Sequence, residues 1–157
     1  MSNDRIIEIT LDEASLVSSI PEVEHERAVA VYDLIEENSF SLVGEFTGPY
    51  AVHLAVEDSN RLAFHIKNAS QAPITKITMS LSPFRRIIRD YFEICESYFD
   101  AIKRMTPSQI ETIDMARRGV HNEGSDILSE RLREKIKIDQ QTARRLFTLV
   151  CVLHIKG

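Results

Sequence analysis

Two short alternating segments on either side of residues 58–60 constrain the fold of this chain more than any other feature. Apolar side chains occupy every second position over 52–56 and again over 62–66, which is the period of a half-buried strand. The residues between them suit a three-residue turn, because Asn60 can take the left-handed conformation. The segments therefore predict an antiparallel hairpin with one wholly apolar face. The expected pairs on that face are Val56 with Leu62, Leu54 with Phe64, and Val52 with Ile66.

The same register places His53 directly opposite His65 on the other face of the hairpin. Opposed Cβ atoms lie about 4.5–5.5 Å apart, and two imidazoles that close do not both carry a proton easily. The pair is therefore either a solvated cross-strand pair or a weak pH-sensitive or metal-capturing spot. A two-residue turn would put Val56 opposite Ala63 and mix the two faces, so that register is excluded.

Other segments before residue 82 extend this sheet and add one helix. A strand is expected over 74–81, and a weak alternation over 5–11 predicts an edge strand with Ile7, Ile9 and Leu11 on one face. A helix is expected from 20 to 38, where Ser19 and Glu22 form a capping box. Its first turn is rich in glutamate, which favours the positive end of the helix dipole.

The chain from residue 82 onward predicts only helices, each with its own start signal. The resulting fold class is α+β: an antiparallel β-meander packed against a layer of about five helices. We expect one domain over 1–157, with the sheet-containing part ending at about 81 and the helical half covering 82–157. The expected helices are 83–105 capped by Ser82, 107–118 with a capping box at Thr106 and a stop at Gly119, 125–135 capped by Ser125, and 140–155 capped by Asp139.

Charge is divided unevenly along the 157 residues. Residues 1–80 carry 5 Lys and Arg against 13 Asp and Glu, whereas residues 81–157 carry 14 against 11, and 10 of those 14 are arginine. The two halves could pair with each other, or they could form a homodimerisation or docking surface. Basic residues are too mixed with acidic ones to indicate a nucleic-acid partner. The hydrophobic content of 43% is typical of a folded globular domain.

No targeting, membrane or metal motif is visible. The N-terminus has an early aspartate and no uninterrupted apolar core, and the longest apolar run, near 146–155, is far short of the roughly 20 residues that span a membrane. Cys95 and Cys151 lack metal-type spacing and are expected to be buried free thiols. These features favour a cytoplasmic protein with no cofactor, no metal and no membrane partner.

Four long sequence segments resemble those of a known protein family. They resemble an alphaproteobacterial family of uncharacterised proteins, one of the numbered UPF groups, and the likeness runs nearly end to end. The resemblance implies a bacterial, cytosolic origin; it implies no activity and no catalytic residue. The strings are VEHERAVAVYDLIEEN (23–38), SPFRRIIRDYFEICESY (82–98), IDMARRGVHNEGS (113–125) and TARRLFTLVCVLH (142–154).

Arginine pairs near expected helix starts are the most suggestive chemical feature. Arg85 and Arg86 follow the Ser82 cap, where a cation opposes the helix dipole at a cost of about 0.3–1 kcal/mol each. A bound anion would offset that cost, and so would an internal carboxylate. The leading hypothesis is a binding or regulatory module that captures a small, phosphate-bearing ligand. Its candidate ligand-binding residues are Arg85, Arg86, Arg145 and Arg27, the last of which could instead pair with Glu96 or Asp114.

A second chemical hypothesis is a small hydrolase or transferase. Residues 121–124 are expected to form a polar loop, in which His121 and Glu123 would act as acid and base. The alternative is a solvated turn. Cys151 and His154 share a helix face, but their apolar surroundings favour core packing over a nucleophile.

Overall fold

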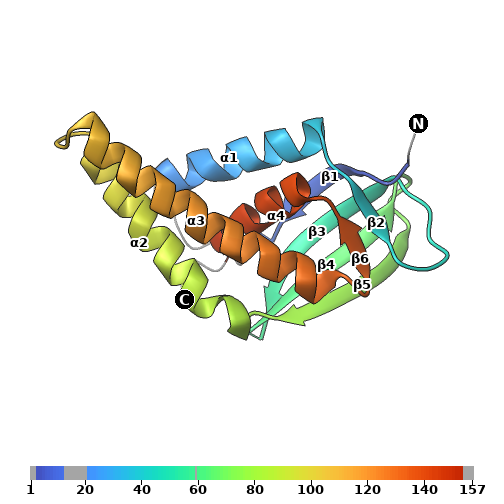
Figure 1. The fold of residues 1–157 in the computed structure, drawn as a ribbon. Helices are drawn as coiled ribbons and strands as arrows, with labels where there is room; N and C mark the ends of the chain where they lie inside the picture. Colours follow the sequence, from blue (N-terminus) through green and yellow to red (C-terminus); the bar gives the residue numbers. More distant parts are fainter. Residues whose placement is uncertain (1–2, 13–20, 59, 154–157) are drawn as a thin grey trace.

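The computed structural model describes residues 3–12, 21–58 and 60–153 (Figure 1). It contains two sheets and, within the described residues, four α-helices, so the fold is α+β as expected. A 3₁₀ turn over Ser82–Phe84 precedes the second helix. The elements in chain order are β1 (Ile6–Leu11), α1 (Pro21–Glu36), β2 (Phe40–Leu42), β3 (Tyr50–Glu57), β4 (Arg61–Asn68), β5 (Pro73–Ser80), α2 (Arg85–Ala101), α3 (Pro107–Leu132), β6 (Ile136–Ile138) and α4 (Gln140–Leu153).

The hairpin of β3 and β4 has the register that the alternation predicts. Leu54 pairs with Phe64, and His53 pairs with His65 on the opposite face. The apolar side chains of this pairing point toward the helices, and all of them are buried except Val56, which is partly buried. β5 continues the sheet antiparallel to β4, as expected of a meander.

β1 is an edge strand, but it runs parallel to β3, so the four-stranded sheet is mixed rather than antiparallel (order β1-β3-β4-β5). The reason is α1, which returns the chain to the end of the sheet where β1 began; parallel neighbours need such a crossover. The expectation that Ile7 shares a face with Ile9 and Leu11 is wrong. Ile7 is exposed and Ile6 is buried, because the register shifts between Ile6 and Glu8.

Two short strands that sequence analysis missed form a second sheet. β2 pairs antiparallel with β6, bringing Leu42 beside Ile136. This pairing ties the segment after α1 to the segment before α4, and each strand is only three residues long. Such short strands carry too little alternation to be seen in a sequence.

α3 is one helix where two were expected, which is why the described helices number four and not about five. Gly119 lies inside it, and Ser125 is a buried helical residue whose hydroxyl donates to the carbonyl of His121. A glycine inside a helix costs about 1 kcal/mol, and burial of the inner face outweighs that cost. The capping box of Thr106 and Gln109 is confirmed at the start of α3.

The start of the helix after β5 also differs from expectation. Ser82 lies in the 3₁₀ turn and makes no cap hydrogen bond; its hydroxyl donates instead to Asn60 Oδ1. α2 therefore begins at Arg85, and Arg86 is its second residue. The Asp139 cap is confirmed at α4, where Oδ1 accepts from the backbone N–H of Thr142 at 2.9 Å. Ser19, half of the capping box expected at α1, lies outside the described residues.

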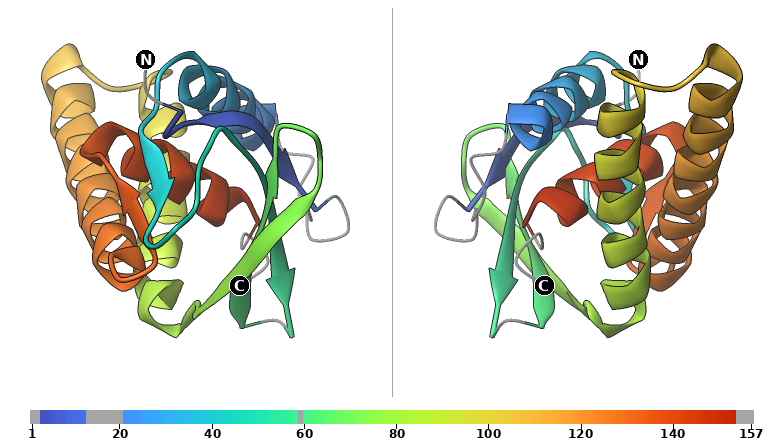
Figure 2. Two further views of the ribbon diagram at one scale, coloured as in Figure 1. Left: turned by 90° about the vertical axis from the view of Figure 1, so that its right-hand side faces the viewer. Right: turned by 90° about the vertical axis from the view of Figure 1, so that its left-hand side faces the viewer.

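α4 forms the centre of the molecule, enclosed by the four-stranded sheet, α1 and the α2–α3 hairpin (Figure 2). From Leu146 to Leu153 every residue of α4 is buried, and Leu146 and Phe147 have no exposed surface. Gly124 of α3 packs directly on the ring of Phe147. No described helix is both long and apolar enough to cross a membrane.

Candidate functional site

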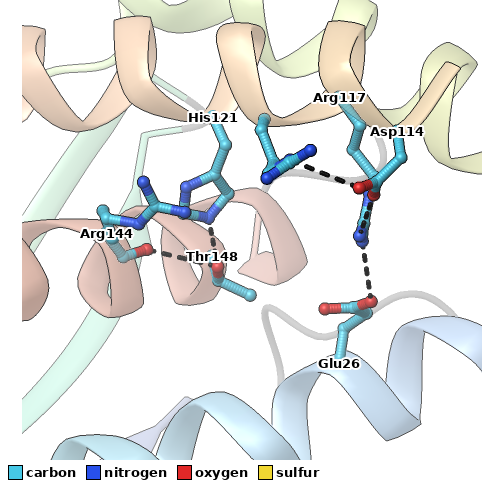
Figure 3. Close-up of polar contacts among 7 residues, drawn as sticks. Glu26, Asp114, Arg117, His121, Arg144 and Thr148 are labelled. Carbon is cyan, nitrogen blue, oxygen red and sulfur yellow. Dashed lines mark hydrogen bonds and ion pairs between the residues drawn. The ribbon is translucent and has the colours of Figure 1, made fainter. Parts of the chain in front are cut away.

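A group of polar side chains, most of them partly buried, lies between the middle of α3 and the first half of α4 (Figure 3). We call it the α3–α4 polar cluster. Arg144 and Thr148 come from α4, where a spacing of four residues stacks them on one face. The α3 side of the cluster consists of His121 and Asn122.

His121 is a partly buried, neutral base, and one of its ring nitrogens makes no hydrogen bond within the described residues. The Thr148 hydroxyl donates to the carbonyl of Arg144 at 3.2 Å, so its oxygen accepts from His121 Nε2, 2.7 Å away. We assign the proton to Nε2 from this network. Nδ1 then carries a lone pair, and it is buried without a hydrogen-bond partner among the described residues. The rings of Tyr91 and Phe147 enclose the imidazole, with centroids 5.6 and 5.4 Å away.

Burial and nearby arginines lower the pKa of His121 to about 4. Burial is the largest cause, because an imidazolium loses its hydration there. The positive charges of Arg144, Arg117 and Arg145 lower the pKa further, in that order. Three guanidinium groups therefore act on one imidazole, and the site is electropositive.

This pKa predicts a loss of stability in acid. Below about pH 6.5 the unfolded chain protonates His121, whereas the folded chain resists until about pH 4, so the free energy of unfolding falls as the pH falls through that window. A shift of this size removes about 2 kcal/mol between pH 7 and pH 5. Urea unfolding should show that His121→Gln loses about 2 kcal/mol less than the wild type over this range. Equal losses would mean that His121 is protonated normally in the folded state.

The three arginines differ in how their charge is balanced. Arg117 contacts Asp114 at 2.7 Å and Glu26 at 3.6 Å, and it lies over the ring of Tyr98. Arg145 has Asp33 only at 3.9 Å and also bonds Gln141; its Nε is buried without a described partner.

Arg144 is the exception. It is partly buried, and its guanidinium donates to the neutral amide oxygen of Asn122. No carboxylate within the described ranges pairs with it, although buried cations are ordinarily paired. The positive charge of Arg144 is therefore not balanced by a negative charge within the cluster.

The two arginines at the start of α2 are exposed, and neither belongs to the α3–α4 polar cluster. Arg85 donates to Asn60 Oδ1 at 2.8 Å. Arg86 contacts Asp90 at 2.9 Å and Glu123 at 3.0 Å, so carboxylates of this chain already balance its charge. Arg85 therefore has a neutral partner, Asn60, whereas Arg86 forms ion pairs with carboxylates of this chain.

The other sequence candidates are distributed over α1, α3 and α4. Arg27 lies 3.6 Å from Glu24 on its own helix; Asp114, one of its expected partners, instead binds Arg117 and Arg118. His121 and Glu123 are helical, so the expected loop at 121–124 is wrong. The structure does not bring these two together, because Glu123 is exposed beside Arg86 while His121 faces Thr148.

The cysteines are buried free thiols, as expected. Burial raises the pKa of Cys95 to about 11 and raises that of Cys151 well above its ordinary value. His154, the proposed partner of Cys151, lies outside the described residues. Among the residues that are described, no group of three or more His, Cys, Asp or Glu side chains is arranged to hold a metal ion.

The sequence did not identify Arg144, Asn122 or Thr148 as candidate site residues. The only available signal was the spacing of four residues between Arg144 and Thr148. The α3 side of the site was not predicted, because residues 121–124 were expected to form a loop and not part of a helix.

Comparison with known proteins supplies the relationship. The model of the uncharacterised protein family UPF0262 matches residues 3–156. The chain belongs to this family. A UPF0262 protein of Rhodospirillum rubrum is 56% identical over 98% of this chain and 94% of its own length. One from Rhodopseudomonas palustris strain TIE-1 is 54% identical over 99% and 95%, and one from Ruegeria pomeroyi is 54% identical over the whole of both chains.

This result confirms the family resemblance noted in the sequence, and the relatives come from alphaproteobacteria. No solved structure matches the chain. The family description assigns no activity.

Proposed function

We propose that this UPF0262 domain is a binding module for a small anion, of the phosphate-bearing class, held by Arg144 at the α3–α4 polar cluster. The observation that supports this most strongly is the partly buried guanidinium of Arg144, which has no carboxylate partner in the described part of the chain. A planar guanidinium fork matches two oxygens of a phosphate or carboxylate.

The surroundings of Arg144 suit an anion. Asn122 fixes the guanidinium by accepting one of its N–H groups and leaves the others for a ligand. Burial is the main cause of the depressed pKa of His121, and the positive charges of Arg144, Arg117 and Arg145 lower it further; an anion would offset that second contribution. Arg145 on the next position of α4 has only a distant carboxylate and adds to this field. Partial burial strengthens such charge-assisted hydrogen bonds relative to those in water.

The ligand-binding role proposed here differs in its residues from the sequence hypothesis. Arg144 becomes the principal ligand and Arg145 a supporting charge. Arg86 becomes less suitable because Asp90 and Glu123 already neutralise it. Arg27 has Glu24 nearby on the same helix.

Isothermal titration with inorganic phosphate and pyrophosphate, at constant ionic strength, tests the proposal. The wild type should bind pyrophosphate at one site, and Arg144→Gln should bind at least tenfold more weakly, because it removes charge-assisted hydrogen bonds worth about 1.5–3 kcal/mol. Arg104→Gln is the matched control: it removes the same charge from an exposed residue that pairs with Asp100 on the neighbouring turn. Its affinity should equal that of the wild type.

Two outcomes would contradict the proposal. Equal weakening by Arg144→Gln and Arg104→Gln would show that only net charge matters. Absence of any saturable binding of either probe would remove the evidence for an anion site at α4.

A further inference from the structure

The face of the four-stranded sheet that turns away from the helices carries one continuous polar row. Thr10 on β1 pairs with His53 on β3, which pairs with His65 on β4, which in turn pairs with Lys76 on β5. The His65 side chain is 37% exposed, so solvent reaches the pair. Nothing in the proposed anion site uses these residues, since His121 and Arg144 lie on helices.

The two imidazoles have nearly the separation that a shared metal ion requires. Their ring centroids are 5.9 Å apart, with the planes inclined at 47°. Two imidazoles on one tetrahedral zinc ion, with Zn–N bonds of about 2.0–2.1 Å, have ring centres roughly 5–5.5 Å apart. Small rotations of these partly exposed side chains close this difference. The strand register fixes the Cα positions, so the pair is preorganised by backbone hydrogen bonds.

A hydrogen bond already orients the first of these rings. Nδ1 of His53 lies 2.7 Å from the hydroxyl oxygen of Thr10, on the strand that flanks β3 on the side away from β4. Because the two ring nitrogens point in widely different directions, Nε2 is directed away from β1 and is free to bind a metal. Metal-binding histidines commonly have this arrangement, in which a second partner fixes the other nitrogen.

The imidazole of His65 makes only a long contact with its nearest carboxylate. Nε2 of His65 is 3.5 Å from Glu57 Oε2, which is longer than the ordinary range for N–H···O. The other oxygen of Glu57 contacts Lys76 Nζ at 3.0 Å. The carboxylate therefore offsets the lysine charge beside the pair and reduces its repulsion of a cation.

We propose that His53 and His65 form a binding site for one divalent transition-metal ion of the zinc, nickel or copper class. Imidazole suits these ions, whereas Mg²⁺ prefers oxygen ligands. The described residues provide no group of three or more metal-binding side chains, so water fills the remaining coordination positions. Binding is accordingly reversible, and the ion is exchangeable at the surface of the sheet.

Zinc titration of the full chain, followed by calorimetry and by NMR of the histidine side chains, tests the site. One Zn²⁺ per chain should bind, with shifts confined to His53 and His65 while Mg²⁺ gives none. His53→Gln and His65→Gln should each bind Zn²⁺ at least tenfold more weakly, and Thr10→Val about tenfold more weakly through loss of the orienting bond. His25→Gln, which removes an exposed histidine from α1, is the control and should bind like the wild type.

The proposal is overturned if the His53 and His65 resonances do not respond to Zn²⁺ in the wild type. It is equally overturned if either single variant binds Zn²⁺ as tightly as His25→Gln does. The wild-type NMR result needs no variant, so it decides the matter even if a substitution harms folding.

Discussion

Gly124→Ala is expected to destabilise the domain by about 2–3 kcal/mol in urea unfolding. A Cβ atom at this position would lie 2.1 Å from Cζ of Phe147, far inside van der Waals contact. Phe147 cannot withdraw easily, because it has no exposed surface and also packs against the rings of Phe84 and His121. The substitution therefore forces α3 and α4 apart or pushes Phe147 off its rotamer.

Gly119→Ala is the matched control on the same helix. A Cβ there meets nothing within 4 Å, so alanine should stabilise the domain by about 0.5–1 kcal/mol through its better helix propensity. In a Gly124→Ala background, Phe147→Leu should cost less than it does alone, since the smaller side chain relieves the overlap. A Gly124→Ala variant as stable as the wild type would show that α3 and α4 do not pack this closely.

Leu146→Ala should cost about 2–5 kcal/mol. Leu146 has no exposed surface and lies on α4, which is enclosed on all sides by other elements. Alanine leaves a cavity that the surrounding sheet and helices cannot fill without distortion. Met115→Ala provides the comparison, because Met115 on α3 is 61% exposed and its truncation should change stability by less than about 0.5 kcal/mol. Similar effects of the two substitutions in urea unfolding would contradict a central position for α4.

The sheet was largely predictable because its determinants are local. The alternation over β3 and β4 and the turn between them fix the register, including the pairing of His53 with His65. The direction of β1 was not predictable in the same way. Parallel pairing with β3 depends on α1 carrying the chain back across the sheet, which no residue within β1 encodes.

The helical half shows where local signals mislead. Gly119 and Ser125 are typical of helix ends, yet both lie inside α3. Tertiary packing keeps α3 continuous through both residues. The Ser125 hydroxyl donates a hydrogen bond to a carbonyl within the helix, and Gly124 permits close contact between α3 and Phe147. Because α3 is continuous, His121 lies on a helix, partly buried against α4, and not in the expected loop.

The candidate site was only partly visible for a related reason. Sequence identifies which residues are arginines, but the balance of their charges depends on carboxylates that are distant along the chain. Arg117 forms an ion pair with Glu26 on α1, and Arg86 forms one with Glu123 on α3. Arg144 instead donates a hydrogen bond to the neutral amide of Asn122. That difference, which motivates the proposed function, exists only in three dimensions.

The most direct test of anion binding at Arg144 uses His121 as a reporter. An NMR titration of the His121 imidazole should be recorded with and without saturating pyrophosphate, at constant ionic strength. An anion held by Arg144 offsets the positive charge that helps to keep the His121 pKa near 4, so pyrophosphate should raise this pKa and shift the ring resonances. Arg144→Gln should abolish the response to pyrophosphate, whereas Arg104→Gln should preserve it. An unchanged His121 titration in the presence of pyrophosphate would contradict an anion site in the α3–α4 polar cluster.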